Sequence, residues 1–110
     1  MEDRGRVVVV SAGFALWIGG RCTAAARWAD VQRLRANRCA FPPTDALSLV
    51  VELVDGSMME LHEEAPGFDA FLDRAAVALP ALAPYARWHA LLVAAPDEGL
   101  VVFERPPRRK

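Results

Sequence analysis

Residues 47–63 read LSLVVELVDGSMMELHE, and this stretch decides the fold. Apolar residues alternate with polar ones on both sides of residues 54–56, which is the pattern of two half-buried strands joined by a tight turn. A three-residue loop aligns the apolar residues of both strands, such as Leu49 with Leu61, whereas a two-residue loop would place polar groups against the apolar face. The segment therefore predicts a β-hairpin in which Gly56 takes a left-handed conformation.

An amphipathic helix is predicted directly after this hairpin, over residues 67–79. Apolar residues recur there with the spacing of one helix face, and Pro80 ends the segment. The members of this apolar stripe are Phe68, Phe71, Leu72, Ala75, Ala76 and Leu79. We expect the stripe to pack on the sheet.

Two further hairpins are predicted near the ends of the chain. Residues 7–18 are rich in β-branched and aromatic residues around Ser11-Ala12-Gly13, which indicates two strands and a turn. Residues 88–95 and 100–105 form the second candidate hairpin, around the turn sequence Pro96-Asp97-Glu98-Gly99.

Residues 23–38 admit two interpretations. Thr23 could cap a helix, and the Ala, Arg, Gln and Leu residues that follow favour one. Interleaved arginines leave the apolar face of that helix thin, however, and the pattern favours a strand, a turn at Trp28-Ala29-Asp30 and a second strand.

Length and composition indicate one domain over residues 1–110. The chain has 54% hydrophobic and 25% charged residues and a formal net charge of −1, which is typical of an ordinary globular protein. The predicted class is α+β, a mostly antiparallel sheet of about six to seven short strands with one helix. The basic tail at residues 105–110 is predicted to be disordered. The near-neutral charge argues against specific nucleic-acid binding, and no segment is long enough for membrane insertion.

Cys22 and Cys39 are predicted to be free thiols in a reducing compartment, because no further Cys or His stands near either at metal-ligand spacing. Arg4, Arg6 and the apolar run that follows imitate a signal peptide, but Gly13 interrupts the run as a hairpin would. We therefore expect a cytoplasmic protein.

Short motifs spread over residues 23–105 carry a resemblance. They are Trp28-Ala29-Asp30-Val31, Asp45-Ala46-Leu47-Ser48-Leu49, Asp55-Gly56, Glu63-Glu64, Gly67-Phe68, Leu79-Pro80, Trp88 and Phe103. Together they resemble small uncharacterised bacterial domains, some of which are similar to pleckstrin-homology or GRAM-type sheets. The resemblance implies a sheet with one packed helix and implies no activity. The order departs from the pleckstrin pattern, because the helix is predicted before the final strands.

The predicted strand over residues 57–64 places Glu60, His62 and Glu64 on one face, because alternate residues of a strand share a face. Carboxylate and imidazole groups are used by divalent metals and by general acid–base pairs. The other interpretation is the solvated face of a half-buried strand, and the linear arrangement favours it.

Four arginines form the densest basic cluster: Arg27, Arg33, Arg35 and Arg38. On a strand, Arg33 and Arg35 would share a face and could hold an anion or the carboxylates of a partner. The alternative is again a solvated polar face.

The first functional hypothesis is a binding or interaction module without catalytic activity, because no complete catalytic, metal or phosphate-binding signature is present. No cofactor is predicted. The high apolar content of so short a chain favours a homodimer, with a protein partner as a further candidate. The alternatives are a small metal-assisted hydrolase using Glu60, His62 and Glu64, and an immunity-type inhibitor of a toxin.

Overall fold

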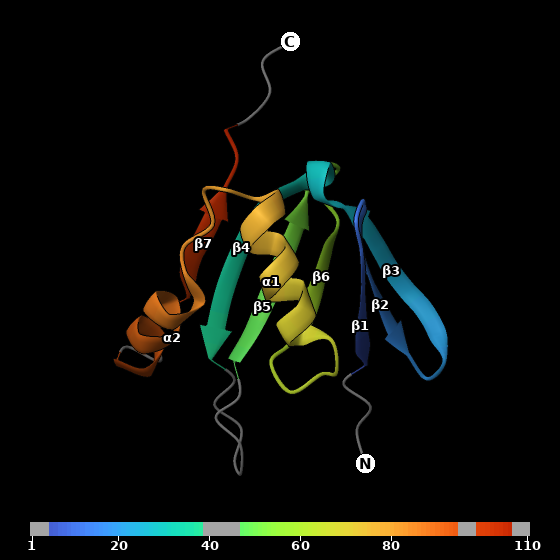
Figure 1. The fold of residues 1–110 in the computed structure, drawn as a ribbon, viewed down its shortest axis with the longest axis horizontal. Helices are drawn as coiled ribbons and strands as arrows, with labels where there is room; N and C mark the ends of the chain where they lie inside the picture. The colour runs from blue at the N-terminus through green and yellow to red at the C-terminus, as the bar shows by residue number, and fades with distance from the viewer. Residues whose placement is uncertain (1–4, 39–46, 95–98, 107–110) are drawn as a thin grey trace.

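The computed structural model describes residues 5–38, 47–94 and 99–106, which form two antiparallel sheets and two α-helices (Figure 1). The strands are β1 (Arg6–Val10), β2 (Gly13–Ile18), β3 (Arg21–Arg27), β4 (Val31–Arg38), β5 (Leu47–Leu53), β6 (Met58–His62) and β7 (Leu100–Glu104). The helical segments are the short η1 (Trp28–Asp30), α1 (Phe68–Ala78) and α2 (Tyr85–Ala94). The predicted α+β class, with mostly antiparallel strands, is confirmed.

The first sheet, which we call sheet A, has the strand order β1-β2-β3. Two-residue turns join its strands, Ser11-Ala12 between β1 and β2 and Gly19-Gly20 between β2 and β3. The predicted hairpin at residues 7–18 is confirmed. Val7, Phe14 and Leu16 point from sheet A into the core, where all three are buried.

The second sheet, sheet B, has the order β6-β5-β4-β7. Leu49 pairs with Leu61, so the predicted three-residue loop is confirmed, and Gly56 in that loop has a φ of 91°. The segment at residues 23–38 forms a strand, the turn η1 and a second strand, as the sequence favoured.

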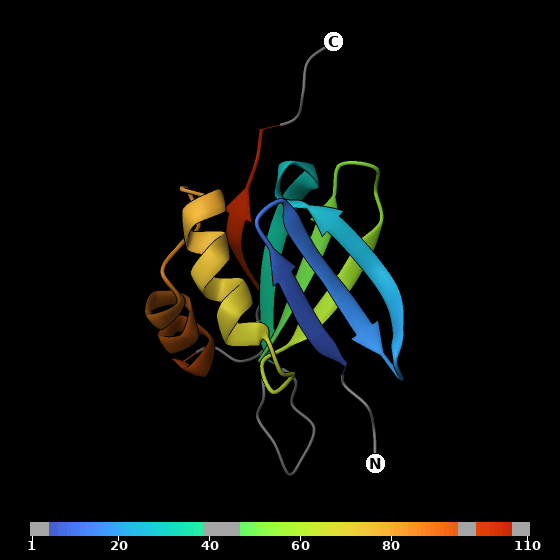
Figure 2. The same cartoon turned by 45° about the vertical axis from the view of Figure 1, so that its right-hand side comes forward.

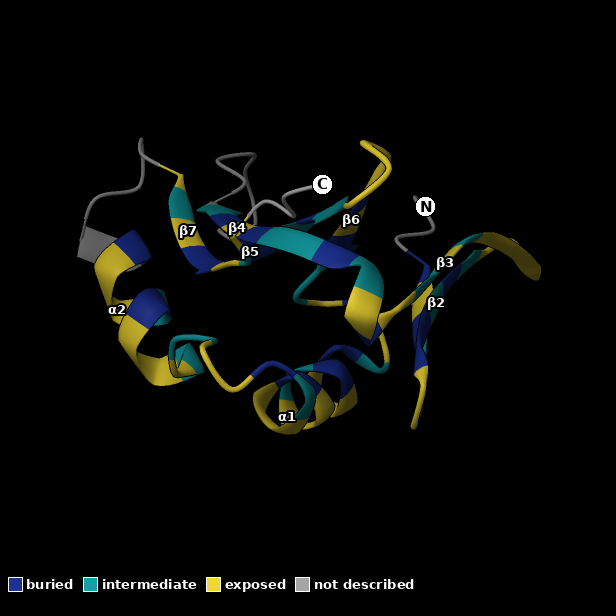
Figure 3. Ribbon diagram, turned by 90° about the horizontal axis from the view of Figure 1, so that it is seen from above, coloured by how far each residue is buried: buried dark blue, intermediate teal, exposed yellow. Residues whose placement is uncertain are grey.

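Both helices lie on one side of sheet B, and sheet A stands next to α1 at an angle to sheet B (Figures 2 and 3). An aromatic cluster fills the junction. The ring centroid of Phe71 lies 4.9 Å from that of Phe14 and 5.4 Å from that of Trp28, so α1, sheet A and η1 meet there. The predicted packing of the helix stripe holds for Phe68, Phe71, Ala75 and Leu79, whereas Leu72 is half-buried and Ala76 is exposed.

The predicted hairpin at residues 88–105 is wrong, and so is the single helix. Residues 85–94 form α2, and β7 pairs with β4 rather than with the segment before it. Trp88 and Leu92, four residues apart, are both buried, which is the spacing of one helix face. The alanines of α2, Ala86, Ala90 and Ala94, favour a helix as well, and they outweigh the β propensity of the bulky residues.

The start of α1 covers the outer edge of β1. Val7 N donates a hydrogen bond to the carbonyl oxygen of Pro66 at 2.8 Å. Gly67 has a φ of 90°, and a Cβ at this position would stand 1.9 Å from the carbonyl oxygen of Val7. The approach of the two backbones therefore requires glycine.

Candidate interaction surface

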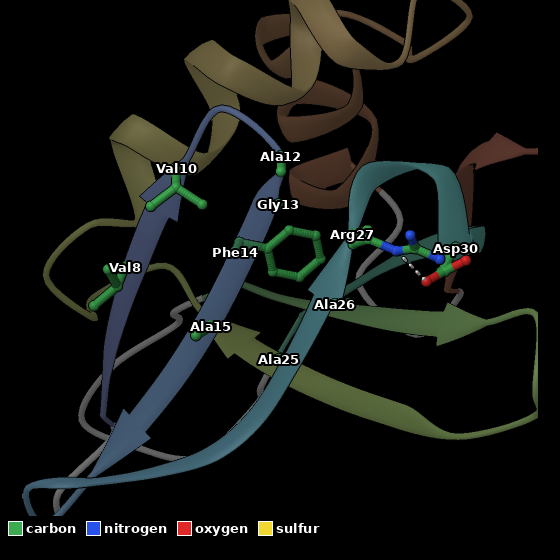
Figure 4. A pocket seen from close by; sticks show the side chains of 10 residues that line it. All are labelled: Val8, Val10, Ala12, Gly13, Phe14, Ala15, Ala25, Ala26, Arg27 and Asp30. Atoms are coloured by element: carbon green, nitrogen blue, oxygen red, sulfur yellow. Dashed lines mark hydrogen bonds and ion pairs between the residues drawn. The ribbon is translucent and has the colours of Figure 1, made fainter.

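The outer face of sheet A, which points away from the core, is mainly apolar. Cross-strand pairing places Val8, Ala15 and Ala25 in one row across the three strands and Val10 and Gly13 in the next. A hollow of about 400 Å³ opens on this face (Figure 4). Its lining residues are Val8, Val10, Ala12, Gly13, Phe14, Ala15, Ala25, Ala26, Arg27 and Asp30.

The hollow exists because small residues occupy its floor while larger ones stand at its sides. Val10 rises on one side with 57% of its surface exposed. On the other side Arg27 Nε donates to Asp30 Oδ2 at 3.2 Å. Gly13 cannot be larger, because a Cβ there would lie 2.1 Å from the carbonyl oxygen of Ala26. An apolar hollow with one ion pair at its rim suits a partner with small apolar side chains.

Strand β3 forms one border of this surface and is an edge strand in the described part of the chain, where it pairs with β2 alone. Most of its residues are exposed, and those between Arg21 and Arg27 are uncharged. A long, uncharged edge strand is a template for pairing with another chain. The sequence signals for this surface were the β-branched and aromatic residues of 7–18 and the alanine run at 24–26. The first contributed to the apolar content that favoured a homodimer, but neither was assigned to a site.

The Glu60, His62 and Glu64 candidates are only partly brought together. His62 Nε2 lies 3.7 Å from Glu60 Oε1 on β6, but the strand ends at His62, and Glu64 falls in the turn that follows. Across residues 5–38, 47–94 and 99–106, no three His, Cys, Asp or Glu residues are arranged to hold a metal ion.

His62 has a second neighbour that the sequence did not single out. Ser48 is its direct cross-strand partner, and Ser48 Oγ and His62 Nδ1 are both buried without a hydrogen-bond partner. Because the two atoms are not bonded to each other, the imidazole does not activate the serine hydroxyl in this arrangement. The pair therefore gives no support to nucleophilic catalysis.

We predict that Glu60→Ala, His62→Ala and Glu64→Ala each change the free energy of unfolding by less than about 1 kcal/mol, since none of these residues lies in the core. Urea melts of the three variants measure this directly. The same melts in the presence of Zn²⁺, Mn²⁺ or Mg²⁺ test for a metal site. A metal-dependent rise in midpoint that His62→Ala abolishes would favour the hydrolase hypothesis instead.

Two arginines of the basic cluster, Arg27 and Arg33, are engaged by carboxylates of the same chain. Arg33 donates to Glu104 at 2.6 Å and contacts Glu52 at 3.4 Å, and the hydrogen bond to Glu104 contributes most to raising the Arg33 pKa. Arg27 contacts Asp30, whereas Arg35 is exposed on the same sheet face as Arg33. The side chain of Arg38 is outside the described part of the structure.

A polar cluster that the sequence did not reveal ties the end of β6 to α2. Glu63 accepts a hydrogen bond from the hydroxyl of Tyr85, and its Oε2 lies 3.9 Å from His89 Nε2. Burial and the Glu63 carboxylate both raise the pKa of Tyr85. Glu63 is 22 or more residues from both Tyr85 and His89, so no local pattern could indicate the cluster. Its contacts are internal, and we interpret it as a structural link.

None of the helices among the described residues is long and apolar enough to cross a membrane. Among the candidates described above, the outer face of sheet A is the one whose geometry favours binding a partner. Comparisons of the chain with protein-family models, curated proteins and solved structures find no match.

Proposed function

We propose that the protein is a cytoplasmic interaction module without catalytic activity that associates with a second copy of itself through sheet A. The observation that carries this proposal is the open apolar hollow on the outer face of that sheet. Exposed apolar patches rimmed by polar residues mark protein–protein interaction sites or ligand-binding grooves.

The arrangement of the two sheets also supports a role for sheet A in binding a partner. Sheet A and sheet B are separate in the described residues and do not close into a barrel, so the outer edge of β3 and the adjoining face stay open. Val10 and Ala25 are exposed on that face although residues of both types are commonly buried. An exposed, free Cys22 on β3 is consistent with a reducing compartment.

The proposal predicts a mass of about twice 12.0 kDa at micromolar concentrations and above. Light scattering coupled to size exclusion measures it. Ala25→Asp places a charge in the middle of the exposed surface of sheet A, and we expect it to shift the protein to the monomer mass.

The matched control is Ala70→Asp, the same change at an exposed alanine of α1, which is expected to keep the dimer mass. Circular dichroism establishes that both variants remain folded. A wild-type mass near 12.0 kDa into the hundreds of micromolar would contradict self-association. A dimer that Ala25→Asp leaves intact would place the contact outside sheet A.

A further inference from the structure

We infer that the second copy binds by pairing its β3 with β3 of the first, antiparallel and about a twofold axis at Ala25. This inference rests on the proposed function and adds to it the strand and the register. It joins the two three-stranded sheets into one continuous sheet across the dimer.

The direction of the backbone N–H and C=O groups along β3 is the first argument for this pairing. A two-residue turn makes Val10 and Gly13 a hydrogen-bonded pair, so the odd-numbered residues of β2 bond to β1 and the even-numbered ones bond to β3. Ala26 pairs with Phe14 and Ala24 with Leu16, which are even-numbered residues of β2. The N–H and C=O groups of Ala25 and Arg27 therefore point outward, where another strand would bind them.

The other strand edges are less suitable. The outer edge of β1 is occupied at Val7 by Pro66 and the adjoining Gly67. In sheet B the edge strand β6 carries Glu60 and His62, and β7 at the other edge contacts α2. Charged side chains and covering segments are the usual protection of an edge strand. Among the described strands, β3 is the edge that is both long and uncharged between its ends.

The register about Ala25 also satisfies the charges. Antiparallel pairing there sets Ala24 opposite Ala26 of the second copy and Arg27 opposite Thr23, so no two arginines face each other. Arg21 pairs with Ile18 beyond the bulge, so its side chain lies on the face opposite to Ala25 and takes no part in this contact. Arg27 is paired with Asp30 of its own chain, so the second copy need not supply a carboxylate for it.

A second copy fits this edge because the edge complements itself. Each β3 supplies the same strand, uncharged between its ends, with the backbone groups of Ala25 and Arg27 directed outward, so the contact is the same on both sides of the twofold axis. Ala25 from each copy also lies on the outer face of its sheet, so the two apolar hollows come to lie side by side. The regular part of β3 runs from Ala24 to Arg27, and the pairing ends at Thr23, because the bulge lies there between the pairs Leu16–Ala24 and Trp17–Cys22.

Proline substitution tests the edge itself. Ala25→Pro removes an N–H that sheet A does not use, so we expect a folded monomer near 12.0 kDa. Ala26→Pro removes an N–H that bonds to β2, and we expect it to unfold. If Ala25→Asp is monomeric and Ala25→Pro remains a dimer, self-association through sheet A stands and pairing of β3 is excluded.

Disulfide trapping tests the register and does not depend on the proline variant folding. In a Cys22→Ser, Cys39→Ser background, Ala25→Cys should form a disulfide-linked dimer on mild oxidation, because paired residues at the twofold axis have Cα atoms about 5.5 Å apart. The control keeps Cys22 and carries only Cys39→Ser; the register separates the two Cys22 residues by about 20 Å, so no linked dimer is expected. Efficient linkage through Cys22, or none through Ala25→Cys, would overturn the register.

Discussion

Phe71→Ala is expected to lower the free energy of unfolding by about 3–5 kcal/mol, the usual cost of removing a large buried aromatic side chain. Phe71 is fully buried, and it is the member of α1 that contacts both Phe14 of β2 and Trp28 of η1. Its loss would leave a cavity where the helix and sheet A meet. Urea denaturation of wild type and variant at equal protein concentration measures the difference.

Val77→Ala is the matched control on the same helix, because 70% of the Val77 side chain is exposed. We expect its effect to stay within about 0.5 kcal/mol. A loss of under about 1 kcal/mol for Phe71→Ala would mean that α1 does not join sheet A to the core as described.

Gly67→Ala is the second change with a large expected effect, and Gly56→Ala is its control. Both glycines have φ near 90°, but Gly56 has open space around the Cβ position, whereas at Gly67 the new Cβ would meet the carbonyl oxygen of Val7. Gly56→Ala should cost about 1–3 kcal/mol from backbone strain alone. Gly67→Ala should cost about 1–3 kcal/mol more, because β1 or α1 must move.

Thermal and urea melts of the two variants give the comparison. The additional loss at Gly67 measures how closely the start of α1 covers the edge of β1. Equal losses would show that this edge is less protected than the structure indicates, and β1 would then compete with β3 as the pairing strand.

Local periodicity was enough to predict the parts of the fold whose partners are near in sequence. The loop at residues 54–56 followed from the parity of its flanking apolar residues, and α1 followed from the spacing of Phe68, Phe71, Ala75 and Leu79. The interleaved arginines of residues 23–38 likewise favoured strands correctly. In each case the side of the element that faces the core is visible within one segment.

Features that depend on distant contacts could not be predicted in this way. The segment 85–94 is short and contains several bulky residues that also occur in strands. Only the structure, in which Trp88 and Leu92 are buried on one face, identifies it as a helix. The pairing of β7 with β4 joins residues about 70 apart. The candidate surface was missed for a related reason: an alanine-rich strand has the same local pattern whether its outer edge is covered or free.

Amide hydrogen exchange at β3, followed by NMR as a function of protein concentration, tests the central claim most directly. The N–H groups of Ala24 and Ala26 point towards β2 and should be protected at every concentration. Those of Ala25 and Arg27 point outward, so they should exchange rapidly in dilute protein and become protected as the dimer forms. Rapid exchange at Ala25 and Arg27 that does not change while the mass doubles would contradict pairing through β3.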